Sequence, residues 1–425
     1  MKITTLRPRA RTTTACIAAA TALALLTACG SSSGGAANGS GPSEDYRITP
    51  AAVSADQTDA VLEKAFLTPD IKAADLDPII VESLNDMSRD FSSDQISTAL
   101  SCMDQPTCKI GEGNQTLAIL DGAGGDLWRH ITRAAITLHA TAYPNIGTVM
   151  YLQADGNLQT MQAQLRTLVT RKVTGIVSYD DFGPAMTAAF QQATSAGIPV
   201  SVYGGTPGPD AVNAVLTQVQ SDFCDDGYQM AEATQKIIGD KGNVAFFTGT
   251  PGNPQGAGWQ KCAEEWFAKN TPEIKVVNKS NTSWTEGGAT TATSALISTG
   301  QKVDAVLYDY AKQSVNIVQA YKQARVDVPA QITWTSDNSL LKMWEEDQKS
   351  DKPWGLAYSS SINYEGNIAL TALMNHLAGD KVPAQLTFPM PFVSAKMGDY
   401  NPQEPPNGPG PTVMPAEMLS KVLAG

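Results

Sequence analysis

Short apolar runs alternate with amphipathic segments along most of the chain from residue 116 onward. Ten runs have the character of buried strands, five before residue 220 and five after it: 116–121, 147–153, 173–179, 198–203, 212–218, 243–248, 274–278, 303–308, 332–335 and 354–358. Helix-length segments separate them, with apolar residues every three or four positions, as in 158–169 and 314–325. Near-continuous apolar strands between helices indicate parallel sheets covered on both faces. We therefore predict an α/β protein with two doubly wound parallel-sheet lobes.

The N-terminal end has the pattern of an export signal. Four basic residues lie within the first eleven positions and precede an apolar run of 12 residues at 15–26. A helix of that length spans about 18 Å, too short for a bilayer core, so a secretory signal peptide is indicated. The sequence LTAC at 26–29 resembles the bacterial lipobox, which implies cleavage before Cys29 and a lipid on its thiol. The alternative is an ordinary signal peptide with an incidental cysteine.

Three further segments flank the strand–helix body. We expect residues 1–28 to be the signal peptide and the Gly/Ser-rich residues 29–43 to be a flexible tether. Residues 44–115 form an N-terminal helical extension, with helices expected at 57–66 and 93–102. The tail, 401–425, contains six prolines in its first fifteen residues, which predicts an extended surface segment.

The charge of the chain argues against some classes of partner. The formal net charge is -12, and without residues 1–28 the chain has 26 basic and 42 acidic residues, or -16. Such an acidic surface repels phosphates, so we expect no nucleic-acid binding. Three histidines in 425 residues argue against a His-rich metal site. Beyond residue 26 no apolar run approaches the ~20 residues of a membrane span.

Four cysteines remain beyond the lipid site, an even number that suits an oxidising compartment. Cys102 and Cys108 would close a short loop, which leaves Cys224 and Cys262 to pair by elimination, although four cysteines allow three connectivities. A zinc site is the competing interpretation. It lacks CxxC spacing and a nearby histidine, so we expect no metal.

Several segments resemble one protein family. The sequence VTGIVSYDD at 173–181, followed by AGIPV at 196–200, resembles the first lobe of the type I periplasmic binding proteins of sugar ABC transporters, which include ribose- and galactose-binding proteins. GDKGNVAFFTGTPGNP at 239–254 and VDAVLY at 303–308 resemble the second lobe. The likeness covers roughly 116–381. The DNA-binding repressors that share this fold begin with a helix-turn-helix, whereas a lipobox occupies that end here.

The resemblance implies that the chain crosses between the lobes three times and thereby forms a hinge. The crossovers are expected near 221–222, near 358–361 and within 384–393. Lobe 1 would then comprise 116–220 plus 359–384, and lobe 2 would comprise 221–358 plus 385–400. Closure about such a hinge would bury a ligand and change the outer surface.

In lobe 1, the first candidate ligand loop is DGAGGDLWR at 121–129. The family places an Asn or aromatic residue here, and Asp126 and Trp128 match those roles best. A dinucleotide loop is the rival interpretation, but GxGxxG is not completed. For Trp128, packing in the core is the alternative to ligand contact.

Residues at the ends of the next two strands are further candidates in lobe 1. Asp180, Asp181 and Phe182 follow a strand where the family has an acidic residue that binds hydroxyls. Helix N-capping is the alternative role for the aspartates. Tyr203 ends the following strand.

Lobe 2 and the hinge supply the remaining candidates. The family's arginine position aligns near Ala257, so no arginine clamp is expected from this lobe, which weakens a ribose-like assignment; Gln255 could contribute instead. The expected ligand contacts are Trp259, Asp309, Tyr310, Asp337 and Ser360. With aromatic faces and carboxylates combined, the pocket suits hydroxyl-rich solutes.

Catalytic signals are missing from the sequence. GxSxG, HExxH and P-loop motifs do not occur, so we expect neither an enzyme nor a cofactor. We predict a monomeric, lipid-anchored, extracytoplasmic solute-binding protein that delivers a sugar or polyol to an ABC permease. A sensor lipoprotein that presents ligand to a membrane receptor is one alternative, and an extracellular hydrolase is another.

Overall fold

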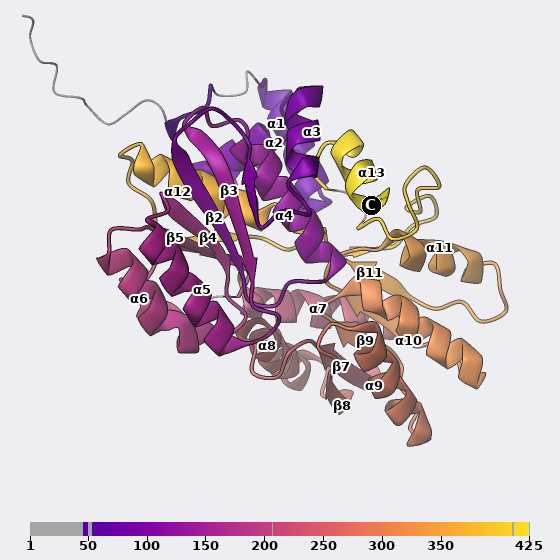
Figure 1. Cartoon of the computed structure of the whole chain (residues 1–425). Coiled ribbons are helices and arrows are strands. Elements are labelled where there is room, and N and C mark those ends of the chain that lie inside the picture. Colours follow the sequence, from indigo (N-terminus) through magenta and orange to yellow (C-terminus); the bar gives the residue numbers. More distant parts are fainter. Residues whose placement is uncertain (1–45, 50–52, 206, 410–411, 425) are drawn as a thin grey trace, which may run out of the picture. The chain divides into compact units, whose positions relative to one another are not determined.

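Two sheets, each mainly parallel, organise the described part of the chain (Figure 1). The computed structural model describes residues 46–49, 53–205, 207–409 and 412–424. The predicted signal peptide, the tether and the lipid site at Cys29 therefore lie outside the described residues. None of the helices in the described ranges combines the length and apolar character needed to cross a bilayer.

The first sheet has seven strands in the order β1-β3-β2-β4-β5-β6-β12. All neighbours are parallel except β1, which pairs antiparallel with β3. The strands are β1 (Thr107–Lys109), β2 (Gln115–Asp121), β3 (Ile146–Gln153), β4 (Gly175–Tyr179), β5 (Val200–Tyr203), β6 (Thr217–Ser221) and β12 (Gln385–Phe388).

The second sheet has six strands in the order β13-β11-β10-β9-β7-β8, and only β13 is antiparallel to its neighbour. The strands are β7 (Lys241–Thr248), β8 (Glu273–Asn281), β9 (Ala305–Tyr308), β10 (Ala330–Thr333), β11 (Leu356–Tyr358) and β13 (Val393–Ser394). The predicted class, two α/β lobes with parallel sheets, is confirmed.

Helices cover both faces of each sheet because successive strand residues point to opposite sides. In β2, Leu117 and Ile119 pack with α4 (Leu127–Ala140) and α12 (Glu365–Leu377), whereas Ala118 and Leu120 face α5 (Leu158–Arg171) and α6 (Thr187–Ser195). In the second sheet, Val244 and Phe246 of β7 face α7 (Phe223–Ile238) and α8 (Pro254–Asn270). Ala245 and Phe247 face α9 (Glu286–Ser298) and α10 (Ala311–Ala324) on the opposite side. Helix α11 (Asn338–Asp347) packs beside α10.

The chain passes between the sheets three times, as predicted. The crossovers follow β6, follow β11 and lie between β12 and β13. The prediction assigned residues from 385 onward to lobe 2, but β12 (385–388) pairs with β6 of the first sheet and so belongs to lobe 1. The chain therefore leaves the first lobe after Phe388.

One predicted strand was misplaced. The apolar run 212–218 does not form a strand along its length, because β6 begins only at Thr217. A 3-10 turn, Pro209–Ala211, comes first, and Val212 is exposed. Ala214 and Val215 are buried although they lie in a loop and not in a strand. The apolar character of this run therefore comes from packing in the core and not from pairing in the sheet.

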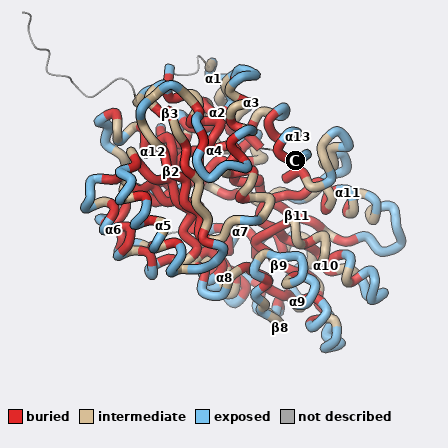
Figure 2. The backbone as a smooth tube through the Cα atoms, in the orientation of Figure 1, coloured by how far each residue is buried: buried red, intermediate tan, exposed pale blue. Residues whose placement is uncertain are grey.

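The N-terminal extension covers α12. Ten consecutive residues of α12, from Glu365 to Met374, are buried, so this helix needs packing partners on all sides (Figure 2). The sheet and α4 cover part of α12, where Asn367 Nδ2 donates to Ala135 O of α4 at 3.0 Å. Helix α2 (Pro78–Met87) covers another part, with Met87 Sδ 3.1 Å from Asn367 Nδ2. Two further helices, α1 (Ala55–Phe66) and α3 (Ser93–Ser101), belong to the extension, and so does the edge strand β1, so the extension is not helical throughout as predicted.

The C-terminal tail ends in a helix, which the proline content did not predict. Residues 401–409 contact the start of α11, where Asn338 Nδ2 donates to Asn401 O at 2.8 Å. Helix α13 (Ala416–Ala424) then packs on α3 and α4, with Met418, Leu419 and Val422 buried. The tail thus contacts both the second lobe and the helices of the first.

Candidate functional site

A cavity lies where the C-terminal ends of strands from both sheets meet the hinge. Its lining comes from the loop after β2, the ends of β4, β9 and β10, the segments that follow β7 and β8, and the start of α12. The lining residues are Asp126, Trp128, Arg129, Tyr179, Gln255, Trp284, Asp309, Tyr310, Trp334, Thr335, Ile362 and Glu365. Ligands of open α/β sheets gather at this edge.

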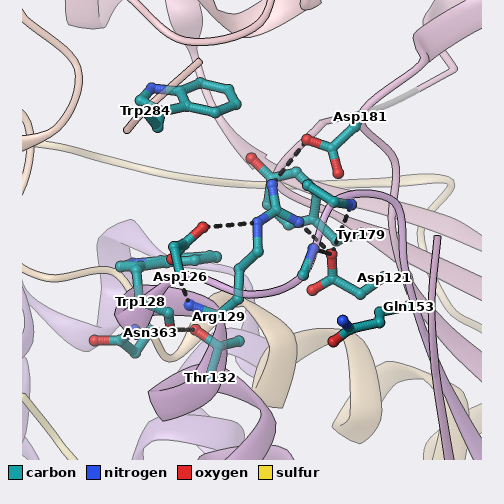
Figure 3. Close-up of polar contacts among 12 residues, drawn as sticks. Asp121, Asp126, Trp128, Arg129, Thr132, Gln153, Tyr179, Asp181, Trp284 and Asn363 are labelled. Atoms are coloured by element: carbon teal, nitrogen blue, oxygen red, sulfur yellow. Dashed lines mark hydrogen bonds and ion pairs between the residues drawn. The ribbon is translucent and has the colours of Figure 1, made fainter. Parts of the chain in front are cut away.

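Arg129 organises the side of the cavity that belongs to lobe 1 (Figure 3). Asp126 caps α4 by accepting from the backbone N–H of Arg129 at 3.0 Å, and it also accepts from Nε at 3.2 Å. The two terminal nitrogens of Arg129 donate to Asp121 at 2.5 Å and to Asp181 at 2.8 Å. The guanidinium also lies 4.0 Å from the ring centre of Tyr179. One cation therefore joins the loops that follow β2 and β4.

Burial and charge oppose each other around Asp181. Removal from water raises the pKa of its carboxyl, and the Arg129 charge lowers it. Arginine stays protonated in proteins, so one permanent positive charge is shared among three carboxylate partners. The arrangement fixes a buried polar wall on the lobe 1 side of the cavity.

Asp309 organises the lobe 2 side. It follows β9 and accepts hydrogen bonds from the indole N–H groups of Trp259, at 2.9 Å, and Trp284, at 2.7 Å. The hydroxyl of Thr248 also donates to it. Burial raises the pKa of Asp309 to about 6, although these three donors favour the charged form. Asp309 thereby fixes the orientation of Trp284 at the cavity.

The two lobes meet directly at the cavity. The Tyr179 hydroxyl donates to Gln255 Oε1 at 3.4 Å, and this contact joins the end of β4 to the start of α8. Trp128 Nε1 donates to the carbonyl of Ser361 in the hinge at 2.7 Å. The rings of Trp128 and Tyr179 meet edge to face, with centroids 5.8 Å apart.

Four of the predicted contacts, Asp126, Trp128, Asp309 and Tyr310, line this cavity. Asp181 is not among the lining residues, but it accepts a hydrogen bond from Arg129, which lines the cavity. Trp259 is fully buried and reaches the site only through Asp309. Gln255, raised as a possible contributor, also lines the cavity.

The other predicted contacts have positions that suit structural roles. Asp180 caps the turn after β4, accepting from the N–H groups of Phe182 and Gly183, and Phe182 packs in the core on the α5 and α6 side. Tyr203 packs edge to face on Tyr179.

Two predicted contacts lie at the second lobe and the hinge. Asp337 caps α11 and lines a small neighbouring cavity with Trp128 and Tyr310. Ser360 is buried and hydrogen-bonds with the Tyr364 hydroxyl at 3.3 Å.

The sequence analysis missed several lining residues. Arg129 and Tyr179 lie next to predicted contacts in the chain, and Trp334 lies at the end of a predicted strand. Because ligands gather at the carboxyl ends of parallel strands, a search of all strand ends could have found these residues. Trp284 lies three residues after β8, so the same reasoning could have found it. An arginine does reach the cavity, but from lobe 1 rather than from the lobe 2 position near Ala257.

The structure joins the four cysteines as Cys102–Cys108 and Cys224–Cys262, the pairing that elimination indicated. The second disulfide connects α7 to α8. Disulfide sulfurs are not thiolate ligands, so the zinc interpretation fails for these cysteines. The described residues contain no group of three or more His, Cys, Asp or Glu side chains that could hold a metal ion.

Comparison with known proteins identifies the family. The model of the periplasmic binding protein domain matches residues 118–381, more than half of the chain. This chain belongs to that family. A comparison with curated proteins gives no match.

Solved structures of the family share the fold of this chain. A binding protein of an arabinose ABC transporter from Shewanella sp. ANA-3, bound to L-arabinofuranose, is 17% identical, with a TM-score of 0.60 over 66% of this chain and 92% of that one. An ABC transporter solute-binding protein from Thermobispora bispora is 24% identical, with a TM-score of 0.59 over 68% and 87%. A third, from Bacillus halodurans with bound myo-inositol, is 16% identical, with a TM-score of 0.58 over 67% and 95%.

Proposed function

We propose that this protein is a lipid-anchored extracytoplasmic solute-binding protein of an ABC importer. It binds a sugar or related polyhydroxylated solute between its lobes and releases it unaltered to a membrane permease. The observation that carries the proposal is the aromatic and carboxylate cavity between two lobes joined by three crossovers.

The side chains of the cavity suit a hydroxyl-rich ring. Five aromatic residues line it, and aromatic faces can cover the C–H surface of a sugar: Trp128, Tyr179, Trp284, Tyr310 and Trp334. Asp126 and Gln255 offer oxygen and amide groups that pair with hydroxyls. Solved relatives of the fold hold L-arabinofuranose and myo-inositol, solutes of this chemical class.

The hinge provides the means of delivery. Closure of two lobes on a ligand changes the surface that both present, and a permease can thereby distinguish loaded from empty protein. Lipid on Cys29 would keep the protein close to the permease at the outer face of the membrane. A monomer is sufficient for this function, since one chain supplies both walls of the cavity.

Thermal-shift measurements of the purified protein against sugars, polyols, nucleosides and amino acids test the proposal. A ligand stabilises a protein by RT ln(1 + [L]/Kd), so a micromolar binder at millimolar concentration adds about 4 kcal/mol. We expect stabilisation by one or a few sugars or polyols, and recovery of the solute unchanged by mass spectrometry. Binding of nucleosides or amino acids alone, or conversion of the solute, would contradict the proposal.

A further inference from the structure

Glu365 differs from the other acidic residues of the cavity. It is the first residue of α12, its exposure is 3%, and it lines the cavity. Asp126 and Asp309 each accept hydrogen bonds from protein donors. Within the described part of the chain, no hydrogen bond or ion pair between side chains involves the Glu365 carboxyl group. A buried carboxyl without a donor is costly, so an unmatched group in a binding cavity points to a ligand donor.

The charge of the cavity lining also indicates a ligand that carries a hydrogen-bond donor with positive charge. Among the described residues that line this cavity, three are acidic and one, Arg129, is cationic. Arg129 already pairs with Asp121, Asp126 and Asp181. Burial raises the pKa of the Glu365 carboxyl, and the Arg129 charge opposes that shift only in part. A cation that entered the cavity would find an acceptor that no protein group satisfies.

The aromatic lining also favours a cation. The faces of indole and phenol rings attract cations, most strongly in desolvated sites. Trp128, Tyr179, Trp284, Tyr310 and Trp334 all line the same cavity as Glu365. These rings suit a neutral sugar equally well, so the unmatched carboxyl is the feature that distinguishes the two kinds of solute.

We propose that the bound solute is a polyhydroxylated molecule with a protonated amine, such as an amino sugar or amino polyol, and that Glu365 accepts hydrogen bonds from its ammonium group. This inference rests on the proposed function and narrows its substrate class. It also assigns Glu365 as a specificity-determining residue of the cavity.

Two other roles for Glu365 make different predictions. An acid in the first turn of a helix can stabilise that helix through its dipole, which would make Glu365 a residue of stability alone. A protonated Glu365 could instead donate to a hydroxyl of a neutral sugar. The first role predicts no effect of Glu365 on ligand choice, and the second predicts no preference for amines.

Matched pairs of ligands test the inference on the unmodified protein. Isothermal titration calorimetry would compare 2-amino-2-deoxyhexoses and 1-amino-1-deoxy polyols with their hydroxyl parents and their uncharged N-acetyl forms. We expect an amine to bind about tenfold to a hundredfold more tightly than its hydroxyl parent, the range for a hydrogen bond to a charged group. Equal or tighter binding of the neutral parents would overturn the inference and leave the proposed function standing. Failure of every sugar and polyol to bind would reject both.

The isosteric variant E365Q separates ligand choice from folding. We expect the ratio of amine to neutral affinity to fall close to one in E365Q and to stay unchanged in the control E232Q, which removes an exposed carboxylate on α7. Titration in two buffers of different ionisation heat supplies a second measurement. Amine binding should release a proton from Glu365 in the unmodified protein and not in E365Q. An unchanged affinity ratio in folded E365Q would overturn the inference.

Discussion

Arg129 and Asp181 form an ion pair with 2.8 Å between Nη2 and Oδ1, in which each side chain is 3% exposed. The pair joins the first turn of α4 to the loop after β4, and Asp121 extends it to the end of β2. Two strand-end loops of lobe 1, those after β2 and β4, therefore depend on one guanidinium. Such a wall can hold the cavity in shape before any ligand arrives.

Arg129→Ala should lower the free energy of unfolding by about 3–5 kcal/mol, because it leaves buried carboxylates without a counter-charge. Urea denaturation measures the change, and Arg166→Ala, at an exposed position on α5, is the control. The double variant R129A/D181N should recover part of the loss, since it removes one of the uncompensated charges. A loss below about 1 kcal/mol would show that the network contributes little to stability.

Asp180 should make stability depend on pH. Burial raises the pKa of its carboxyl to about 8, whereas an aspartate in an unfolded chain titrates near ~3.9. The folded state therefore binds the proton more tightly, so this stabilisation is complete below about pH 4 and is lost as pH rises through 8.

Asp180→Asn tests this dependence, because the amide oxygen can still accept from the N–H groups of Phe182 and Gly183. We expect D180N to match the unmodified protein near pH 4 and to exceed its unfolding free energy at pH 8 by about 2 kcal/mol or more. Urea denaturation at several pH values measures the difference, with D210N, at an exposed turn, as control. A difference that does not change with pH would contradict the assignment.

Trp128→Ala should raise the Kd for the solute about tenfold or more, since a central aromatic residue commonly dominates a binding site. The half-buried ring also packs on core residues of both lobes, so some loss of stability is expected as well. Calorimetry and thermal unfolding measure the two effects. Trp266→Ala is the matched control, a half-buried tryptophan that does not line the cavity. If W128A melts far below W266A and a folded fraction binds normally, Trp128 is a core residue only.

Met418→Ala should lower the free energy of unfolding by about 2–5 kcal/mol, because Met418 on α13 is fully buried against α3 and α4. Lys421→Ala, which removes an exposed ion pair with Glu417 on the same helix, should change it by less than about 1 kcal/mol. Equal effects of the two substitutions would indicate that α13 does not form part of the core.

Cys29→Ala tests the lipid anchor. Without the thiol, lipid cannot attach, so we expect release into the medium or accumulation of an uncleaved precursor. Membrane fractionation and mass spectrometry of the N-terminus distinguish these outcomes. Cys16→Ala is the control, since this cysteine lies within the predicted signal peptide. Normal processing and retention of C29A would argue against the lipobox.

Much of the fold followed from local pattern. The alternation of apolar runs and amphipathic segments predicted the two α/β lobes, and the family resemblance implied the three crossovers. Asp309 and Tyr310 were predictable because they follow a strand, and the carboxyl ends of the strands share one edge of each sheet. The family resemblance pointed to Asp126 and Trp128 in the loop after β2. Short strands such as β12 and β13 were not predictable, because two to four residues carry too little pattern.

The partners of the site residues depended on the tertiary structure. Asp180 and Asp181 are adjacent and chemically identical, yet one caps a turn and the other meets Arg129, because neighbouring side chains at a strand end point in different directions. Glu365 enters the cavity only because α12 packs against lobe 1 and begins at the hinge. Local sequence by itself determined most of the strands and helices of the two lobes, through the periodicity of apolar residues. Only the packing of distant segments decided which side chains face the ligand, because those contacts join residues separated by as many as 235 positions.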